Sequence, residues 1–304
     1  MEFGKVNTLE NILFALPPDN PATTRMLEAT ESINYLKPQV YIGCPTWHNK
    51  QWLGSYYPAD ASDKDLLHWY SRQFNAIEVN TTYYRIPETS TIDRWRQQVS
   101  PNFKLCPKVP QSISQDLKLS QARELIKIFK EALTGLQEHL GVVFLQLSPA
   151  FGPEETNTLL SFFESLPKDF PLAVEFRHPA WFSNPNQAEI LWTAMEALGI
   201  STVITDVAGR RDVLHARLTT ATAFIRFNGY GLHRTDFSRI DEWVKRLQSW
   251  LDQGLQTIYF FIHQEDVNHS AALLNYLIDQ LARFCGIQLA KSKPIPQLIQ
   301  GKLF

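Results

Sequence analysis

From residue 38 onward, short apolar runs alternate with longer amphipathic stretches. Runs of four to seven β-branched and aromatic residues are typical of buried strands, and apolar residues three or four positions apart are typical of helices. The runs predict strands at residues 40–43, 76–80, 103–108, 142–147, 172–177, 201–206, 223–228 and 257–263. The amphipathic stretches predict helices at residues 62–74, 89–99, 120–133, 154–165, 186–198, 237–253 and 268–284. The pattern at residues 210–218 is weaker and predicts at most one short helix there.

Eight strands that alternate with helices in one chain predict an α/β fold, a (β/α)8 TIM barrel, with residues 38–304 as a single barrel domain. The competing arrangement is an open doubly wound sheet, whose first turn is usually rich in glycine. Here the first turn reads Gly43-Cys44-Pro45-Thr46-Trp47, without a GxGxxG or Walker motif. Residues 1–37 differ from the rest and are expected to be an N-terminal extension with one or two short helices. They would form either a surface cap or a partly disordered tail.

Strand parity predicts which side chains point into the barrel, because successive side chains of a strand face opposite sides. In residues 76–80, Ile77 and Val79 should face the helices, so Glu78 and Asn80 point inward. The same rule predicts inward positions for Lys104, Cys106, Lys108, Phe144, Gln146, Glu175, Arg177, Arg226 and Asn228. Asp206 and His263 end the sixth and eighth strands.

The inward set is unusually charged, because barrel interiors are ordinarily filled with branched aliphatic side chains. Burying an unpaired charge costs several kcal/mol, so charged groups persist inside only when they are paired, solvated or functional. Two explanations remain open. The charges form a site at the C-terminal mouth, or they form an internal ion-pair network such as Glu78–Arg226 and Glu175–Lys108.

The loops that follow the strands carry aromatic and glycine residues. Aromatic side chains at a barrel mouth either stack on a sugar ring or nucleobase or pack the loops onto the rim. The turn at residues 228–231 reads NGYG and follows the seventh strand, where barrels frequently bind phosphate. We therefore expect an anion beside Arg226, Asn228 and Gly229, with Arg177 or Lys108 as a second contact. The alternative is that Glu78 or Glu175 neutralises Arg226 and no anion enters.

Composition excludes several classes of partner. Lys and Arg total 29 against 31 Asp and Glu, a net charge of −2, which gives no electrostatic surface for nucleic acid or an anionic membrane. No apolar run approaches the ~20 residues that span a bilayer. The three cysteines include no CxxC pair, so neither a zinc ribbon nor a thioredoxin motif is predicted. We therefore expect the protein to be located in the reducing cytoplasm. The residues His263, Glu265, Asp266 and His269 lack a ligand spacing, so no metal is predicted, and the cofactor and oligomeric state stay unknown.

Six motifs resemble, in chain order, the YecE-like proteins, a family designated a domain of unknown function. They are GCPTWHNKQWLGSYYP (43–58), FNAIEVNTTYYRIP (74–87), FKLCPKVPQSIS (103–114), FLQLSPAFGP (144–153), VEFRHPAWF (174–182) and IRFNGY (225–230). The resemblance implies a TIM barrel and supplies no reaction. It implies that the family pattern includes Glu78, Asn80, Thr81, Thr82, Tyr83, Lys108, Gln146, Glu175, Arg177, His178, Pro179 and Trp181.

Two functional hypotheses follow. In the first, the protein is an enzyme, a hydrolase, isomerase or lyase, that acts on a small sugar-like, nucleotide-like or phosphorylated ligand by acid–base chemistry at the barrel mouth. Its predicted catalytic residues are Glu78, Glu175 and Lys108. Its predicted ligand-binding residues are Trp47, Asn80, Thr82, Tyr83, Gln146, Arg177, His178, Trp181, Asp206, Arg226, Asn228, Gly229 and His263. In the second, a non-catalytic barrel binds a metabolite or a protein partner and lacks a competent base.

Overall fold

The computed structural model describes residues 3–31, 37–167, 169–183 and 185–295. Eight strands lie in this part of the chain, and each coincides with a predicted run. They are β1 (Gln39–Gly43), β2 (Ala76–Val79), β3 (Lys104–Pro107), β4 (Val143–Gln146), β5 (Leu172–Glu175), β6 (Ser201–Asp206), β7 (Thr222–Asn228) and β8 (Thr257–His263). The apolar periodicity therefore predicted the strands correctly.

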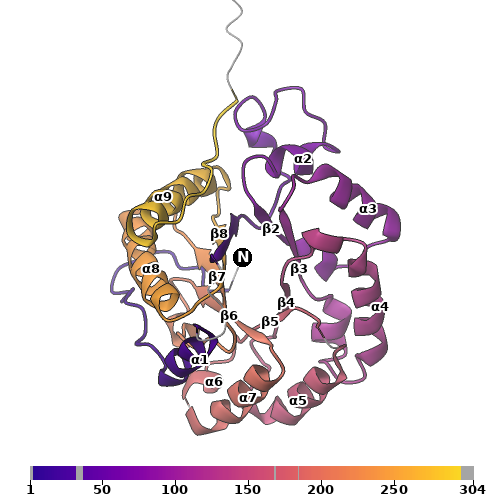
Figure 1. The fold of residues 1–304 in the computed structure, drawn as a ribbon, viewed down its shortest axis with the longest axis vertical. Coiled ribbons are helices and arrows are strands. Elements are labelled where there is room, and N and C mark those ends of the chain that lie inside the picture. The colour runs from indigo at the N-terminus through magenta and orange to yellow at the C-terminus, as the bar shows by residue number, and fades with distance from the viewer. Residues whose placement is uncertain (1–2, 32–36, 168, 184, 296–304) are drawn as a thin grey trace, which may run out of the picture.

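The strands form a six-stranded sheet in the order β1-β8-β7-β6-β5-β4 and a separate pair, β2-β3. All neighbouring strands are parallel. Figure 1 shows them arranged around a central axis with the helices outside. The predicted closed (β/α)8 barrel is not confirmed, because the sheet is not closed between β1 and β2 or between β3 and β4. The fold is α/β with a mainly parallel central sheet.

Side chains take the place of ladder hydrogen bonds at the seam between β1 and β2. The Asn75 amide accepts from the Ile42 N–H at 2.7 Å and donates to the Val40 carbonyl at 2.8 Å. The Tyr70 hydroxyl accepts from the Cys44 N–H at 2.7 Å. These backbone groups of β1 and its end are therefore satisfied without a neighbouring strand, which strand periodicity does not reveal.

Nine α-helices lie in the described residues, and the strands are connected mainly through them. They are α1 (Pro21–Glu31), α2 (Leu66–Tyr70), α3 (Thr89–Gln98), α4 (Arg123–Thr134), α5 (Thr156–Ser165), α6 (Ala180–Ser183), α7 (Pro185–Ala197), α8 (Arg234–Asp252) and α9 (Asn268–Cys285). Short 3-10 turns are η1 (Lys50–Trp52), η2 (Asn80–Tyr83), η4 (Gln137–His139), η5 (Pro153–Glu155) and η6 (Arg211–Val213), and η3 (Ser112–Asp116) is a π-turn. Helix α2 is shorter than predicted at both ends, and the Ser62 hydroxyl donates to the Asp65 carboxylate and does not cap the helix.

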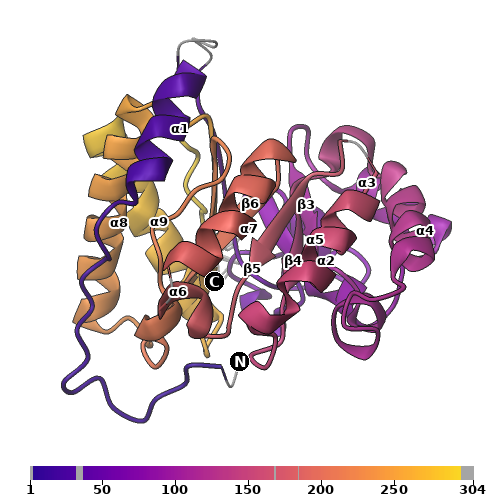
Figure 2. The same ribbon diagram turned by 90° about the horizontal axis from the view of Figure 1, so that it is seen from below.

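Helix α1 of the N-terminal extension covers the connection between β6 and β7, which contains η6 and no α-helix. The Thr23 hydroxyl donates to the Ala216 carbonyl and accepts from the Leu218 N–H. Leu27 is fully buried in the main hydrophobic core. In Figure 2 the extension runs along the lower edge and up beside α8 before it becomes α1. One helix and no strand lie in residues 3–31, so the expected helical content of the extension is confirmed.

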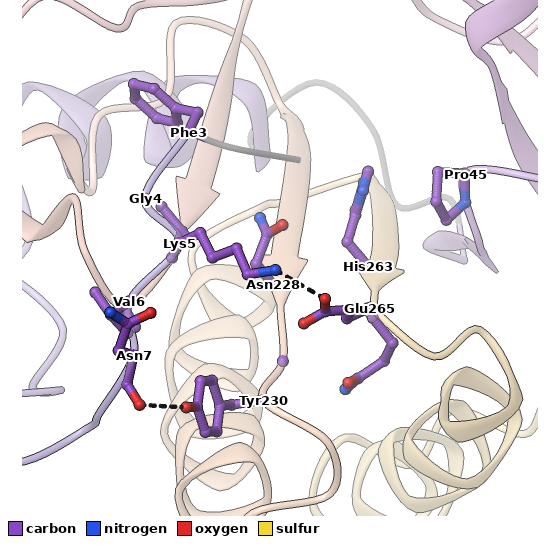
Figure 3. A pocket seen from close by; sticks show the side chains of 14 residues that line it. Phe3, Gly4, Lys5, Val6, Asn7, Pro45, Asn228, Tyr230, His263 and Glu265 are labelled. Carbon is purple, nitrogen blue, oxygen red and sulfur yellow. Dashed lines mark hydrogen bonds and ion pairs between the residues drawn. The ribbon is translucent and has the colours of Figure 1, made fainter.

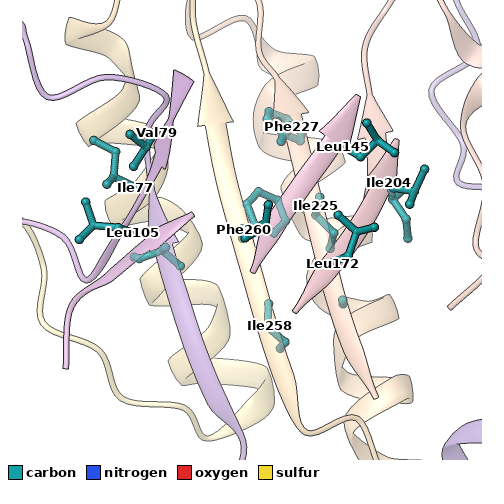
Figure 4. Close-up of a cluster of buried hydrophobic side chains, with 14 of the residues drawn as sticks. Ile77, Val79, Leu105, Leu145, Leu172, Ile204, Ile225, Phe227, Ile258 and Phe260 are labelled. Carbon is teal, nitrogen blue, oxygen red and sulfur yellow. The ribbon is translucent and has the colours of Figure 1, made fainter. Parts of the chain in front are cut away.

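Strand parity is confirmed by the two hydrophobic clusters. Ile77, Val79, Leu105 and Ile225 face outward and belong to the large core between strands and helices (Figure 4). A second, inner cluster is enclosed by the strands and consists of Ala76, Cys106, Phe144, Ala173, Val203, Phe224, Tyr259 and Phe261. Lys104 lies at the N-terminal end of β3, where its ammonium donates to the Glu138 carbonyl at 2.6 Å. The other polar inward residues follow the inner cluster toward the C-terminal ends of the strands, so this cluster is their apolar floor.

Candidate functional site

A buried network of carboxylates and guanidinium groups lies above the inner cluster. The Arg226 Nε and Nη2 atoms donate to the two Glu78 oxygens at 2.8 and 3.1 Å, and Nη1 donates to Glu175 Oε2 at 2.6 Å. The Arg177 Nε atom donates to Glu175 Oε1 at 2.7 Å. All four side chains are buried. The prediction that Glu78 and Glu175 point inward, each within salt-bridge reach of Lys108, Arg177 or Arg226, is confirmed through the two arginines.

These contacts fix the charge of both glutamates. Burial raises the pKa of Glu78, but Arg226 and His263 outweigh it and hold that pKa well below its usual range. Burial likewise raises the pKa of Glu175, and Arg177 and Arg226 bring it far below normal. The two carboxylates in turn raise the pKa of the Arg226 guanidinium, against the effect of its burial. Both glutamates are therefore ionised at neutral pH, which makes them electrostatic anchors rather than proton donors.

The predicted anion site beside Arg226 is wrong. The Arg226 residue is 1% exposed, and each of its side-chain nitrogens already donates to a carboxylate. The NGYG turn is equally occupied: the Gly229 N–H donates to the His263 carbonyl, the Tyr230 N–H to the Asp236 carboxylate, and the Gly231 N–H to the Gln264 side chain. No backbone donor of these three residues is available for an anion. The alternative, neutralisation of Arg226 by Glu78 and Glu175, holds.

Asp206 was predicted to bind ligand, and the structure contradicts this. Val203 of the same strand points into the inner cluster, so by parity Asp206 faces the helices. Its carboxylate accepts from Arg239 Nη2 at 2.8 Å and from Trp243 Nε1 at 2.7 Å, both on α8, and it also pairs with Arg211. Asp206 therefore attaches α8 to β6. The inward neighbour Thr205, whose buried hydroxyl has no partner among the described residues, was missed.

Three other residues that were predicted to bind ligand make structural contacts. The buried Thr82 hydroxyl donates to the carbonyls of Val79 and Lys108 at 2.8 and 2.7 Å, which joins the ends of β2 and β3. The Trp181 indole is buried and donates to the Phe151 carbonyl. The Trp47 ring packs edge-on against the Trp95 ring, with 5.9 Å between the ring centres, and contacts the main core. These aromatic rings pack the loops onto the rim.

Lys108 lies on the β3 side of the mouth. Its ammonium donates to Gln146 Oε1 at 2.8 Å and sits 4.1 Å from the centre of the Tyr83 ring. The Gln146 amide donates to Glu175 Oε2 at 2.9 Å, so a neutral side chain links Lys108 to the buried network. Burial and the nearby Arg226 lower the pKa of Lys108 to about 8. This value makes Lys108 able to gain or lose a proton near neutral pH.

Two predicted residues beside this region stabilise loop backbone. The Asn80 amide donates to the Pro45 carbonyl at 3.2 Å. The His178 Nδ1 atom accepts from the Ala180 N–H at 3.2 Å, which closes the turn before α6. Both contacts hold the rim in place, and both side chains are partly exposed.

A pocket of about 440 Å³ lies at the C-terminal ends of β7 and β8 (Figure 3). It is lined by Phe3, Gly4, Lys5, Val6, Asn7, Pro45, Val207, Ala208, Asn228, Gly229, Tyr230, His263, Gln264 and Glu265. Three of the predicted ligand-binding residues, Asn228, Gly229 and His263, are therefore brought together here. Lys108 does not line this pocket. A series of side-chain contacts through Gln146, Glu175, Arg226 and Glu78 connects it to the pocket residue His263. No sequence signal pointed to residues 3–7, because their position depends on the path of the whole extension.

Two side chains of the pocket have free hydrogen-bonding capacity. His263 Nε2 lies 3.1 Å from Glu78 Oε1, and its Nδ1 has no hydrogen-bond partner among the described residues. Burial lowers the pKa of His263, and the attraction of Glu78 only partly opposes this. The buried Asn228 Nδ2 has no partner in the described part of the chain. The pocket thus combines a neutral imidazole with an unused amide donor.

In the described ranges no three or more His, Cys, Asp or Glu side chains lie close enough together to hold a metal ion. Cys44, Cys106 and Cys285 are free thiols. A search of the same residues found no helix with the length and apolar character that crossing a membrane requires.

Comparison with known proteins assigns the chain to a defined family. Residues 41–298 match the family described as "Protein of unknown function DUF72", and the chain belongs to this family. It is 30% identical over 283 residues to the UPF0759 protein YecE of Escherichia coli K12, an alignment that covers 87% of this chain and 100% of that protein. It is 26% identical over 153 residues to the UPF0759 protein YunF of Bacillus subtilis 168, which covers 48% of this chain and 53% of that one.

A crystal structure of a DUF72 family protein from Enterococcus faecalis V583 has a similar fold. The TM-score is 0.65 at 20% identity, and the match covers 83% of this chain and 99% of that chain. The predicted resemblance to YecE-like proteins is confirmed by these relatives, and none of their descriptions assigns a reaction.

Proposed function

We propose that this protein is an enzyme that transfers a proton to or from a small, uncharged polar ligand held in the pocket beside β7 and β8. The observation that carries the proposal is the contact of His263 Nε2 with Glu78 at 3.1 Å in a pocket of about 440 Å³. A histidine oriented by a buried carboxylate is a common arrangement for a general base.

The charge of Glu78 determines the tautomer of His263. Because Arg226 and His263 keep Glu78 ionised, its oxygen can only accept a hydrogen bond, so Nε2 of His263 carries the proton. A neutral ring then has its lone pair on Nδ1. Glu78 thus acts as a positioning residue, which modifies its predicted catalytic role, and Arg226 keeps Glu78 in place through two hydrogen bonds.

The polar lining favours an uncharged ligand. The charged residues of the pocket wall are Lys5 and Glu265, which pair with each other at 2.8 Å. No concentration of positive charge is left for a phosphate, so the sugar-like class is favoured over the phosphorylated one. The Asn228 amide would donate to a hydroxyl or carbonyl oxygen of the ligand.

Lys108 supplies a second proton-transfer group in this proposal. Its pKa of about 8 suits a general acid at neutral pH, and Tyr83 and Gln146 hold its ammonium in place. Gln146 donates to Glu175, which is held in turn by its ion pair with Arg177. Because Lys108 does not line the pocket, a ligand would have to extend beyond it toward β3 to contact this ammonium.

We also propose that the two sheets act together as one (β/α)8 barrel with two seams, formed by residues 38–304 and preceded by an extension of residues 1–37. A few backbone hydrogen bonds bridge the seams. The Glu78 N–H donates to the Cys44 carbonyl at 3.4 Å between β1 and β2. Between β3 and β4, the Val109 N–H donates to the Phe144 carbonyl at 2.9 Å and the Gly141 N–H to the Leu105 carbonyl at 2.8 Å. We further propose that the partner of this protein is a small molecule and that the protein is located in the cytoplasm.

A thermal-shift screen with uncharged sugars and their phosphate esters tests the ligand class. A ligand at about 100 times its Kd adds ~2.7 kcal/mol to the free energy of unfolding. Stabilisation by uncharged compounds is expected, and stabilisation by phosphate esters alone would contradict the proposal.

Turnover of the compound found is then compared in wild type and His263→Gln. The glutamine amide can still donate to Glu78 but cannot take a proton, so binding should persist while kcat falls by roughly 10²–10⁴-fold. Binding without turnover in the wild type would favour the non-catalytic alternative.

A further inference from the structure

Residues 3–7, here called the N-terminal strap, cross the loops that follow three strands. The Gly4 carbonyl accepts from the Gly209 N–H at 3.0 Å in the loop after β6. The Asn7 carbonyl accepts from the Tyr230 hydroxyl at 3.1 Å after β7. The Lys5 ammonium pairs with Glu265 at 2.8 Å after β8. The strap is therefore attached to every loop that lines the pocket on its β6–β8 side.

The first described residue of the strap contacts two arginines. The Phe3 ring centre lies 4.1 Å from the Arg177 guanidinium carbon and 4.5 Å from that of Arg210, within the range of cation–π attraction. Arg177 is itself bonded to Glu175, so Phe3 connects the strap to the buried network. The Lys5–Glu265 pair is mostly exposed, at 56% and 83%, and such pairs contribute little.

Gly4 allows the strap to lie this close to the loop after β6. Its φ of 75° is in the left-handed region, which favours glycine. A Cβ atom at this position would lie 2.7 Å from a Val207 methyl carbon. A larger residue at position 4 would therefore push the strap away from the pocket.

The strap supplies five of the fourteen residues that line the pocket, yet it lies outside residues 41–298, the part that matches the family. We infer that the strap is a specificity-determining wall of this chain, which restricts access to His263 and sets the size of ligand that fits. The inference rests on the proposed function only for the identity of the pocket.

Chemical labelling of His263 with diethyl pyrocarbonate tests this inference in the full-length protein. The reagent acylates neutral imidazole, and mass spectrometry measures the rate at each histidine. The strap variants are Phe3→Ala with Lys5→Ala, and separately Gly4→Val. Leu13→Ala is the matched control, because Leu13 is in the same extension, is 80% exposed and does not line the pocket. The exposed His48 is the internal reference.

Both strap variants should increase the labelling rate of His263 at least fivefold relative to His48, and Leu13→Ala should not. Equal rates of His263 labelling in the wild type and in both strap variants would overturn the inference, as would a His263 that stays unlabelled in all of them. The labelling rate measures access rather than catalysis. A wild-type protein without turnover would therefore refute the proposed function and leave this result unaffected.

Discussion

His263 Nε2 lies 3.1 Å from the carboxylate of Glu78, although 185 positions separate the two residues in the chain. The contact joins the end of β8 to β2, strands that belong to different sheets. It also ends a chain of buried contacts that runs from His263 through Glu78 and Arg226 to Glu175. The polar network therefore connects the two sheets through side chains, where no ladder of backbone hydrogen bonds joins them among the described residues.

Replacing Arg226 by methionine should reduce the free energy of unfolding by about 3–5 kcal/mol, because the change leaves Glu78 and Glu175 buried with one cation fewer. Urea denaturation measures the effect. The control is Lys245→Met, which removes an exposed ion pair with Glu242 and should change stability little. Equal effects of the two substitutions would show that the buried network does not stabilise the fold.

Stability should fall in acid as the glutamates of the network become protonated. The pKa values of Glu78 and Glu175 are lowered by folding, so below about pH 4.3, the ordinary value, the unfolded chain binds more protons than the folded chain. The stabilisation is complete above that pH and is lost as the pH falls toward the folded-state values. Urea titrations from pH 7 to pH 3 should show a smaller loss for Glu175→Gln than for wild type. Parallel losses would contradict the assigned shift.

Lys108 should give a pH dependence of the same sign in alkali, although its shift costs stability below pH 8 instead of adding to it. Its pKa is lowered to about 8 in the folded protein, whereas the unfolded value is ~10.4. Between these values the unfolded chain binds more protons, so folding becomes more favourable as pH rises. The free energy of unfolding of the wild type should therefore rise relative to Lys108→Met from pH 8 to pH 10. If the difference between the two proteins is constant over this range, the pKa of Lys108 is ordinary.

Truncation of Leu27 tests whether α1 belongs to the core. This side chain is fully buried, so Leu27→Ala should cost about 2–5 kcal/mol of unfolding free energy. Leu13→Ala, in the same extension, removes a side chain that is 80% exposed and should change stability little. A small, equal effect of both changes would mean that the extension is a dispensable tail.

The inner residues of the site were predictable because strand parity is a local property. Once β2, β5 and β7 are recognised from their apolar residues, the inward direction of Glu78, Glu175 and Arg226 follows, and ion pairing follows from the cost of buried charge. Asp206 was misassigned because its position at a strand end was used without the parity of its strand.

The remaining features depend on contacts between distant segments. Asn75 and Tyr70 replace strand pairing at the seam, and no periodic pattern marks such a substitution. Helix α1 covers β6 and β7 from almost two hundred residues earlier in the chain. The contact of Phe3 with Arg177 likewise joins residues that are far apart in the sequence. Local propensity identified the elements but not these associations.

The protonation state of His263 tests the central claim most directly. A two-dimensional ¹H–¹⁵N spectrum of the imidazole nitrogens, recorded from pH 5 to pH 8 and assigned with His263→Gln, reports both the pKa and the tautomer. We expect a pKa below 6.5 and, at pH 7, a neutral ring with its proton on Nε2 and a free lone pair on Nδ1. A charged imidazolium at pH 7, or a proton on Nδ1, would contradict the role of His263 as a base held by Glu78.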